Sequence, residues 1–282
     1  MVVSSLDLEA GCSEAAVIQN FRATADTKLL WHSAEAEKTW KPRLPLINVA
    51  AFQAERLSVL EGLRPACQQV MFPNQALEAM AWAMSNGLKT RILGQVGAFS
   101  GFSHRYPEGD DMVILGMGKT NEALTEGPDD GTDLGYPDCC RKFWALHFPE
   151  ISDPVWQWAS DSDIQTDTIE YKNGQGFSPN RFVTATKKVD SPAETNPTLR
   201  YWGIRLAPHI PCGPLCEGSF VRGSQFRALM GEPGDWARDL LLLPTHWSSY
   251  RGVVIVKNRF FRIVAPGDAW AERYHLHVNG EV

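Results

Sequence analysis

The sequence predicts an α/β or α+β fold in which a mixed sheet is flanked by helices and a β-hairpin lies near the C-terminus. Two observations predict this class. Stretches with apolar residues at helical spacing alternate with shorter runs rich in Val, Ile and Phe, and glycine or proline separates many of them. The composition is 44% hydrophobic and 21% charged, which supplies enough apolar side chains for a core without cross-links.

We expect a single domain that covers residues 1–282. No linker and no internal repeat is visible in the sequence, and 282 residues fit one large domain. Residues 160–198 are polar and contain turn-forming pairs such as Asn173-Gly174 and Ser178-Pro179. This stretch is therefore the candidate for a flexible insertion.

Helices are expected early in the chain. Residues 49–63 carry apolar side chains at helical spacing. The clearest helix follows between Asn74, which can cap its start, and Gly87, which occupies the place of a left-handed C-terminal residue. One face of this helix is apolar and is expected to pack on the core: Leu77, Met80, Ala81 and Met84.

Strands are expected further along. Residues 112–116 form a continuous apolar run, which predicts a buried strand, and residues 199–206 alternate well enough to predict another. The strongest strand signal is a hairpin of residues 252–256 and 260–264, separated by Lys257-Asn258-Arg259. We expect this hairpin to pack as an edge of the sheet.

Charge and hydropathy argue against several classes of protein. The net charge is −6, whereas a nucleic-acid binder normally presents a basic surface that neutralises phosphates. No run approaches the ~20 apolar residues that cross a bilayer. The N-terminal stretch reaches Asp7 and Glu9 without a Lys or Arg, unlike a secretion signal. We expect a cytoplasmic protein that binds neither nucleic acid nor membranes.

Four of the six cysteines lie in two short clusters. These clusters are Gly135-Tyr136-Pro137-Asp138-Cys139-Cys140 and His209-Ile210-Pro211-Cys212-Gly213-Pro214-Leu215-Cys216. Thiols stay reduced in the cytoplasm, so clustered cysteines there indicate metal or redox chemistry more often than disulfides. We predict that the fold brings the two clusters together and that their sulfurs share one inorganic centre.

Each cluster is expected to open a helix. Asp138 can cap a helix that carries Cys139 and Cys140 in its first turn and ends before Phe148-Pro149. Cys216 is expected to begin the next helix. Free N–H groups and the helix dipole lower the pKa of thiols at such positions, and the thiolate is the form that binds metal.

Three kinds of centre are compatible with these residues. A [4Fe–4S] cluster could be bound by three of the four cysteines Cys139, Cys140, Cys212 and Cys216, which leaves one iron open. It accepts a vicinal pair more easily than one small ion because adjacent side chains diverge. A zinc ion could be bound in a Cys3His shell by His209, Cys212, Cys216 and one cysteine of the pair. A metal-free dithiol could cycle to a disulfide. The bland alternative is a set of buried thiols with a core histidine.

The two clusters also resemble known cysteine patterns. Gly135 to Cys140 and His209 to Cys216 read Gly-Tyr-Pro-x-Cys-Cys and His-x-Pro-Cys-x3-Cys, which is similar to a pattern in a poorly characterised prokaryotic family. A fainter similarity is to the cysteine-rich domain of heterodisulfide reductase subunits, where a Cys-Cys pair and a later Cys-x2-Cys hold an iron–sulfur cluster. Here Arg141 replaces the glycine after the pair, the later spacing is x3, and the upstream cysteine lacks a clear counterpart. This second resemblance implies cluster binding.

The leading prediction is a metalloenzyme that uses a [4Fe–4S] cluster on a small molecule, by sulfur transfer, desulfuration or a lyase-type step at an open iron. Cys139 and His209 are candidate catalytic groups, and Arg205 and Arg222 are candidate anchors for an anionic substrate. An electron or sulfur donor protein would be its partner. The alternative is a zinc-stapled binding module without catalysis. His275-x-His277 is a weaker candidate metal site.

Overall fold

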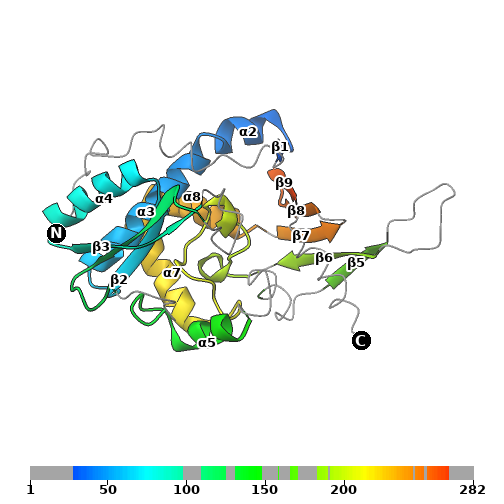
Figure 1. Cartoon of the computed structure of the whole chain (residues 1–282). Coiled ribbons are helices and arrows are strands. Elements are labelled where there is room, and N and C mark those ends of the chain that lie inside the picture. Colours follow the sequence, from blue (N-terminus) through cyan, green and yellow to red (C-terminus); the bar gives the residue numbers. More distant parts are fainter. Residues whose placement is uncertain are drawn as a thin grey trace. The chain divides into compact units, whose positions relative to one another are not determined.

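The computed structural model of the chain describes residues 28–97, 109–124, 131–147, 158, 166–170, 183–189, 191–243, 245–250 and 253–266. Its elements fall into two compact units (Figure 1). The first unit contains Glu55–Gly135, and the second contains Ala23–Ala54 and Tyr136–Val282. The helix α3 (Arg43–Leu60) begins in the second unit and ends in the first.

The first unit is a three-stranded antiparallel sheet covered by a helix. Its strands follow the order β2-β4-β3, and α4 packs against β3 and β4. Because β4 lies between two strands, nearly all of its side chains are buried, as predicted for this apolar run. The elements are β2 (Ala66–Met71), α4 (Pro73–Ser85), β3 (Lys89–Val96) and β4 (Met112–Gly118).

Helix α4 was predicted correctly, but its buried face was not. Ala76, Ala79 and Ala83 are buried, whereas Leu77 and Met84 are 70% and 67% exposed. Small side chains let a helix approach a sheet closely, so packing selects a face that hydrophobicity alone does not mark. Of the expected core stripe, Met80 packs against the core, whereas Leu77, Ala81 and Met84 are exposed, so the prediction is wrong for these three residues.

The ends of α4 differ in how well they were predicted. Asn74 does not cap the helix; Phe72 stands at the N-cap position, and its N–H donates to Gln75 Oε1 at 3.1 Å. The side chain of Gln75, three residues further along, thus satisfies the backbone N–H of the N-cap residue. Phe72 itself has no polar side chain to cap the helix. Gly87 follows the helix with φ 76°, the left-handed conformation that was expected.

The second unit contains a six-stranded antiparallel sheet with the order β1-β9-β8-β7-β6-β5. The predicted hairpin is present as β8 and β9, and Asn258 in its turn accepts hydrogen bonds from the N–H groups of Phe260 and Phe261. The strands are β1 (Lys28–Trp31), β5 (Thr166–Glu170), β6 (Val183–Val189), β7 (Thr245–Tyr250), β8 (Val253–Lys257) and β9 (Phe261–Pro266).

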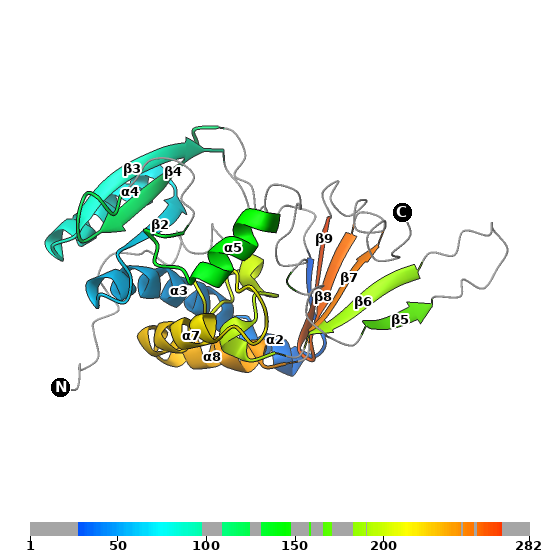
Figure 2. The same ribbon diagram turned by 90° about the horizontal axis from the view of Figure 1, so that it is seen from below.

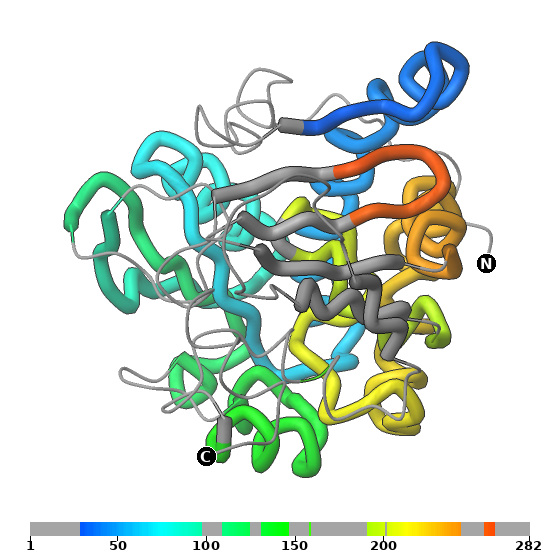
Figure 3. Tube along the Cα trace, turned by 90° about the vertical axis from the view of Figure 1, so that its right-hand side faces the viewer, coloured from blue at the N-terminus to red at the C-terminus, as the bar shows by residue number. Residues whose placement is uncertain are grey.

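The hairpin does not form an edge of the sheet, in contrast to the prediction. Strand β7 pairs with β8, and β1 pairs with β9 beside the turn of the hairpin (Figure 3). Strand β1 comes from the other end of the chain, and no local pattern reveals such a distant pairing. The predicted α/β or α+β class is confirmed in its α+β form, with two antiparallel sheets in place of a mixed one.

Helices of the second unit pack against one another beside its sheet (Figure 2). Helix α7 lies against α8, and the guanidinium of Arg43 lies over the rings of Trp40 and Trp236, which ties the start of α3 to α8. None of the described helices is long and apolar enough to cross a membrane. The helices are α2 (Ala34–Trp40), α5 (Asp138–His147), α7 (Glu217–Met230) and α8 (Glu232–Leu241).

Residues 191–211 of the second unit are mostly buried and form no strand. Two short 3-10 helices, η1 (Ala193–Thr195) and η2 (Arg200–Trp202), interrupt the segment, and Gly203 has φ 78°. The predicted strand at 199–206 is wrong because η2 occupies Arg200–Trp202 and Gly203 follows in the left-handed conformation, so the backbone is not extended. The tentative insertion at 160–198 includes β5, β6 and the buried residues 191–198, and its other residues lie outside the described part.

The contact between α7 and η1 predicts a sensitive glycine. A Cβ at Gly223 would lie 2.6 Å from the carbonyl oxygen of Glu194, whereas a Cβ at Gly213 would meet no heavy atom within 4 Å. Gly223→Ala is expected to lower the free energy of unfolding by about 1–3 kcal/mol through overpacking. Gly213→Ala is the control and should change it by less than about 0.5 kcal/mol. Equal urea midpoints for both variants would contradict this close contact.

Candidate metal centre

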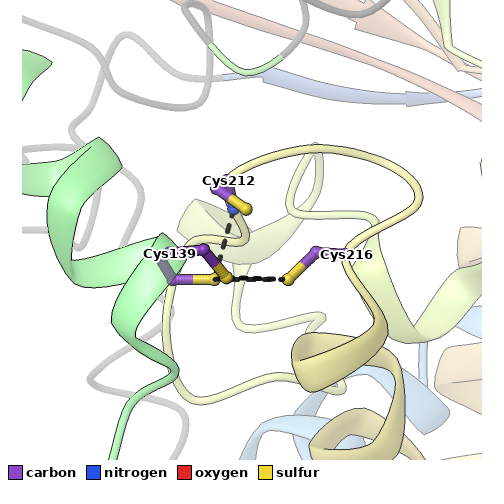
Figure 4. A group of neighbouring side chains, drawn as sticks. Cys139, Cys212 and Cys216 are labelled. Carbon is purple, nitrogen blue, oxygen red and sulfur yellow. Dashed lines mark hydrogen bonds between the residues drawn. The ribbon is translucent and has the colours of Figure 1, made fainter.

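Two distant segments bring four cysteines to one point. The Sγ atoms of Cys139, Cys140, Cys212 and Cys216 all lie within 4.8 Å of one another, although Cys140 and Cys212 are 72 residues apart in the chain. Figure 4 shows Cys139 on the green helix α5, facing Cys212 and Cys216 from the yellow segment. The prediction that the two clusters converge is confirmed, and such a group could bind a metal.

The first pair is positioned by the start of α5. The carbonyl oxygen of Pro137 accepts hydrogen bonds from the N–H groups of Cys140 and Arg141, at 2.9 and 3.0 Å. Both cysteines therefore lie in the first turn, as predicted, and α5 ends at His147. Asp138 is the first residue of the helix rather than its cap, and its carboxylate pairs with Arg141 at 2.9 Å.

The second pair lies in a turn that leads directly into α7. The Cys216 N–H donates to the Gly213 carbonyl at 3.2 Å, and Cys216 is the N-cap residue of α7, as expected. The Thr195 hydroxyl donates to the Pro214 carbonyl at 2.6 Å, which ties the turn to η1. A Cβ at Gly218 would lie 3.1 Å from Pro137, so the first turn of α7 lies against the start of α5.

The sulfur spacing suits one tetrahedral ion. Cys139 and Cys140 are 3.9 Å apart, Cys139 and Cys216 are 3.6 Å apart, and Cys140 and Cys216 are 3.5 Å apart. These distances are far above the ~2.05 Å of a disulfide, and all described cysteines are free. A zinc ion with four bonds of ~2.3 Å to sulfur places its ligands roughly 3.8 Å apart. The vicinal pair therefore converges, although adjacent side chains were expected to diverge.

The four sulfurs have different surroundings. Cys140 is 3% exposed, and its Sγ lies 3.1 Å from the Ser219 hydroxyl and accepts a hydrogen bond from the Cys212 N–H at 3.4 Å. Cys216 is 9% exposed and Cys212 is half-buried. Cys139 is exposed. The centre thus has a buried side, formed by α7, and an open side at Cys139.

His209 stands behind the centre and does not belong to it. Its Nε2 lies 2.8 Å from the hydroxyl of Ser219, which is fully buried, and Ser219 in turn contacts Cys140. The ring of Tyr136 packs on His209 with centroids 5.0 Å apart. Among the described residues, the group of close ligand atoms contains the four cysteines without a histidine. The fourth place of the expected Cys3His shell is therefore filled by cysteine.

Ser219 is the site residue that sequence reasoning missed. It bridges His209 and Cys140, and its only signal in the sequence is its place in the first turn after Cys216. A buried hydroxyl at this place has few partners besides the sulfur and the imidazole. Ser219 therefore orients the Cys140 sulfur by the same logic as residues that hydrogen-bond metal ligands in other proteins.

The surroundings of the sulfurs raise the pKa of two of these thiols and lower the pKa of a third. Burial raises the pKa of Cys140 well above its ordinary value and raises that of Cys212 to about 12. Burial also acts against ionisation of Cys216, but hydrogen bonds from Ser219, Cys140 and Cys139 outweigh it and lower the pKa to about 7. The Cys216 thiol therefore ionises at lower pH than those of Cys140 and Cys212, and binding a metal would release protons from these two residues.

The predicted substrate anchors lie in different places. The Arg205 guanidinium lies over the ring of Phe52, 5.2 Å from its centroid, and it is not on a strand. Arg222 is half-buried on α7. Neither belongs to the cysteine group, so their role as anion anchors stays a prediction. His275 and His277 lie outside the described residues.

The low pKa of Cys216 predicts the pH dependence of alkylation in metal-free, reduced protein. Its reaction with iodoacetamide should rise with pH to a plateau, with a midpoint near pH 7. Ser219→Ala removes a hydrogen bond that stabilises the thiolate, so the midpoint should move to higher pH and the rate at neutral pH should fall. Peptide mapping by mass spectrometry measures both, with Ser224→Ala on the same helix as control. An unchanged midpoint in Ser219→Ala would show that Ser219 does not set this pKa.

Comparison with known proteins adds no assignment to this geometry. No family model, no curated protein and no solved structure matches the chain.

Proposed function

We propose that the chain is a zinc protein in which Cys139, Cys140, Cys212 and Cys216 bind one tetrahedral Zn²⁺. The spacing of the sulfurs carries this proposal, since the three pairwise distances of 3.5, 3.6 and 3.9 Å bracket the roughly 3.8 Å expected for a single ion. Four cysteine thiolates are also a typical donor set of structural zinc. The centre would fasten the start of α5 to the turn before α7.

A [4Fe–4S] cluster is supported less well by this spacing. Each of its irons carries a separate thiolate, so the cysteine sulfurs of such a cluster stand on the order of 6 Å apart. All four sulfurs here lie within 4.8 Å. Spreading them would separate Gly218 from Pro137 and break the hydrogen bond between the Cys212 N–H and Cys140. The sulfur-transfer, desulfuration or lyase chemistry predicted at an open iron belongs to this second alternative.

The surroundings of the sulfurs are suited to an anionic centre. Four thiolates around Zn²⁺ carry a net negative charge, which is costly to bury. Cys139 and Cys140 lie in the first turn of α5 and Cys216 lies at the N-cap of α7, so two helix N-termini face the charge. The Cys212 N–H and the Ser219 hydroxyl add hydrogen-bond donors at Cys140. These groups offset the cost of holding the thiolates.

A closed shell of four protein ligands favours a structural role. Catalytic zinc keeps one coordination position for water or substrate, and four cysteine ligands leave none. We therefore infer a zinc-stapled module that acts by binding, the alternative expected from the sequence with a cysteine in the place of His209. A small anionic substrate and a donor protein stay predictions tied to the iron–sulfur alternative.

Metal analysis tests the proposal directly. Protein purified without oxygen should be colourless and hold about one zinc per chain, with neither iron nor acid-labile sulfide. Cys140→Ser should abolish zinc binding because it removes a buried ligand. Cys67→Ser is the matched control, since Cys67 is buried in the core of the first unit, and it should retain the metal. Brown protein with iron and labile sulfide would overturn the zinc assignment in favour of a cluster.

The hydrogen bond from Ser219 predicts a change in affinity without loss of a ligand. Ser219→Ala should weaken zinc binding by roughly 10–100-fold, the usual effect of removing a group that orients a ligand. Competition with a chromophoric chelator measures the affinity, and Co²⁺ substitution should show a shifted thiolate charge-transfer band. Ser224→Ala should change neither quantity. If Ser219→Ala has the same zinc affinity and the same Co²⁺ spectrum as the wild type, the hydroxyl does not orient the Cys140 ligand.

A further inference from the structure

We propose that Cys139 is the reactive thiolate of the centre and that it accepts a soft carbon electrophile, such as an activated methyl group. This inference rests on the proposed zinc function and adds an activity to it. Four coordinated thiolates would share the same metal, so differences in reactivity must come from the protein around each sulfur. Two such differences distinguish Cys139 from its neighbours.

The first difference is access. Nucleophilic attack on carbon needs an open line between sulfur and the incoming group, and among the four residues only Cys139 is classed as exposed. Cys140 and Cys216 are 3% and 9% exposed, and Cys212 is intermediate. Cys139 belongs to the first turn of α5, while α7 covers the opposite side of the group (Figure 4). An electrophile from solvent therefore meets Cys139 first.

The second difference is hydrogen bonding. Donors withdraw negative charge from a thiolate and so reduce its nucleophilicity. The Cys140 sulfur accepts a hydrogen bond from the Cys212 N–H and lies 3.1 Å from the Ser219 hydroxyl, and the Cys216 thiolate is stabilised by the Ser219 N–H. In the described part of the chain, the hydrogen-bond contacts of the Cys139 sulfur are with other cysteine sulfurs, which donate no proton once they are thiolates. Cys139 thus keeps most of its charge.

Cys212 is the nearest competitor. Its sulfur interacts with Cys139 and Cys216, and its own N–H is directed to Cys140. Cys212 lies in the turn that precedes α7 and is half-buried. The expected order of reactivity in the zinc form is therefore Cys139, then Cys212, with Cys216 and Cys140 last.

The step itself is a simple displacement. The Cys139 sulfur attacks the carbon, the sulfur–carbon bond forms, and the bond from carbon to the leaving group breaks. The leaving group departs with the electron pair, so no oxidant, reductant or proton is needed. The product is a thioether, and the centre loses one negative charge. Because the sulfur–carbon bond of a thioether is not readily broken, the alkyl group would stay on Cys139.

Methylation of the zinc-loaded wild-type chain tests the inference. Zinc is first quantified, the protein is treated with limiting methyl iodide near neutral pH, and the modified residues are mapped by mass spectrometry. Within the group of four cysteines, one methyl group is expected, on Cys139. Its rate should not vary with pH near neutrality because a coordinated thiolate is already ionised. Cys67, fully buried and outside the group, serves as an internal control and should stay unmodified.

The variant Cys139→Ser provides a second test of the site of methylation. In zinc-loaded Cys139→Ser, the rate of methylation should fall about tenfold or more, and residual modification should move to Cys212. The mapping of wild type needs no variant, so it remains decisive if Cys139→Ser does not fold.

The outcomes separate this inference from the zinc proposal. Zinc-loaded protein that is methylated first at Cys212, or equally at all four cysteines, would overturn the role of Cys139 and leave the zinc centre intact. Protein that binds no zinc would overturn the proposed function, and this inference with it.

Discussion

The candidate metal centre depends on one constraint, which is that four sulfur atoms from two distant segments lie within 4.8 Å of one another. Their separation is set by contacts between the segments that carry them. Pro137 lies against Gly218 at the start of α7, and Thr195 holds the turn through the Pro214 carbonyl. The same contacts place two helix N-termini toward one point, so geometry and electrostatics favour an anionic thiolate centre together.

The constraint has a cost in the absence of metal. Burial disfavours ionisation of Cys140 and Cys212, so without a metal these sulfurs are crowded neutral thiols that contribute little beyond packing. Under the proposed zinc assignment, the metal would replace their protons and turn a weak contact into four strong bonds. Binding and local folding are coupled in such a site. The first unit has a core of its own, formed by α4 and its sheet with Val59 of α3, and its stability need not follow the metal.

The sequence predicts the features that local chemistry determines. The cysteine clusters, the helix that begins at the vicinal pair and the C-terminal hairpin each follow from residues close together in the chain, and each is present. The missed features depend on distant contacts. Ser219 contacts Cys140 across 79 residues, β1 pairs with β9 from the other end of the chain, and α4 selects its alanines because of the sheet beneath. The spacing of the sulfurs, which separates one ion from a cluster, likewise needs three-dimensional distances.

The vicinal pair gives two neighbouring sulfurs different surroundings. Adjacent residues of a helix are rotated by about 100° around its axis, so two neighbouring cysteines in a first turn cannot have the same surroundings. Cys140 turns toward Ser219 and α7 and is buried there, while Cys139 reaches the same centre from the solvent side. Once a metal has ionised all four thiols, differences in pKa no longer rank them, and access and hydrogen bonding do. A Cys-Cys pair at a helix start therefore places one protected ligand beside one accessible ligand, a division that a more widely spaced pair on the buried side would lack.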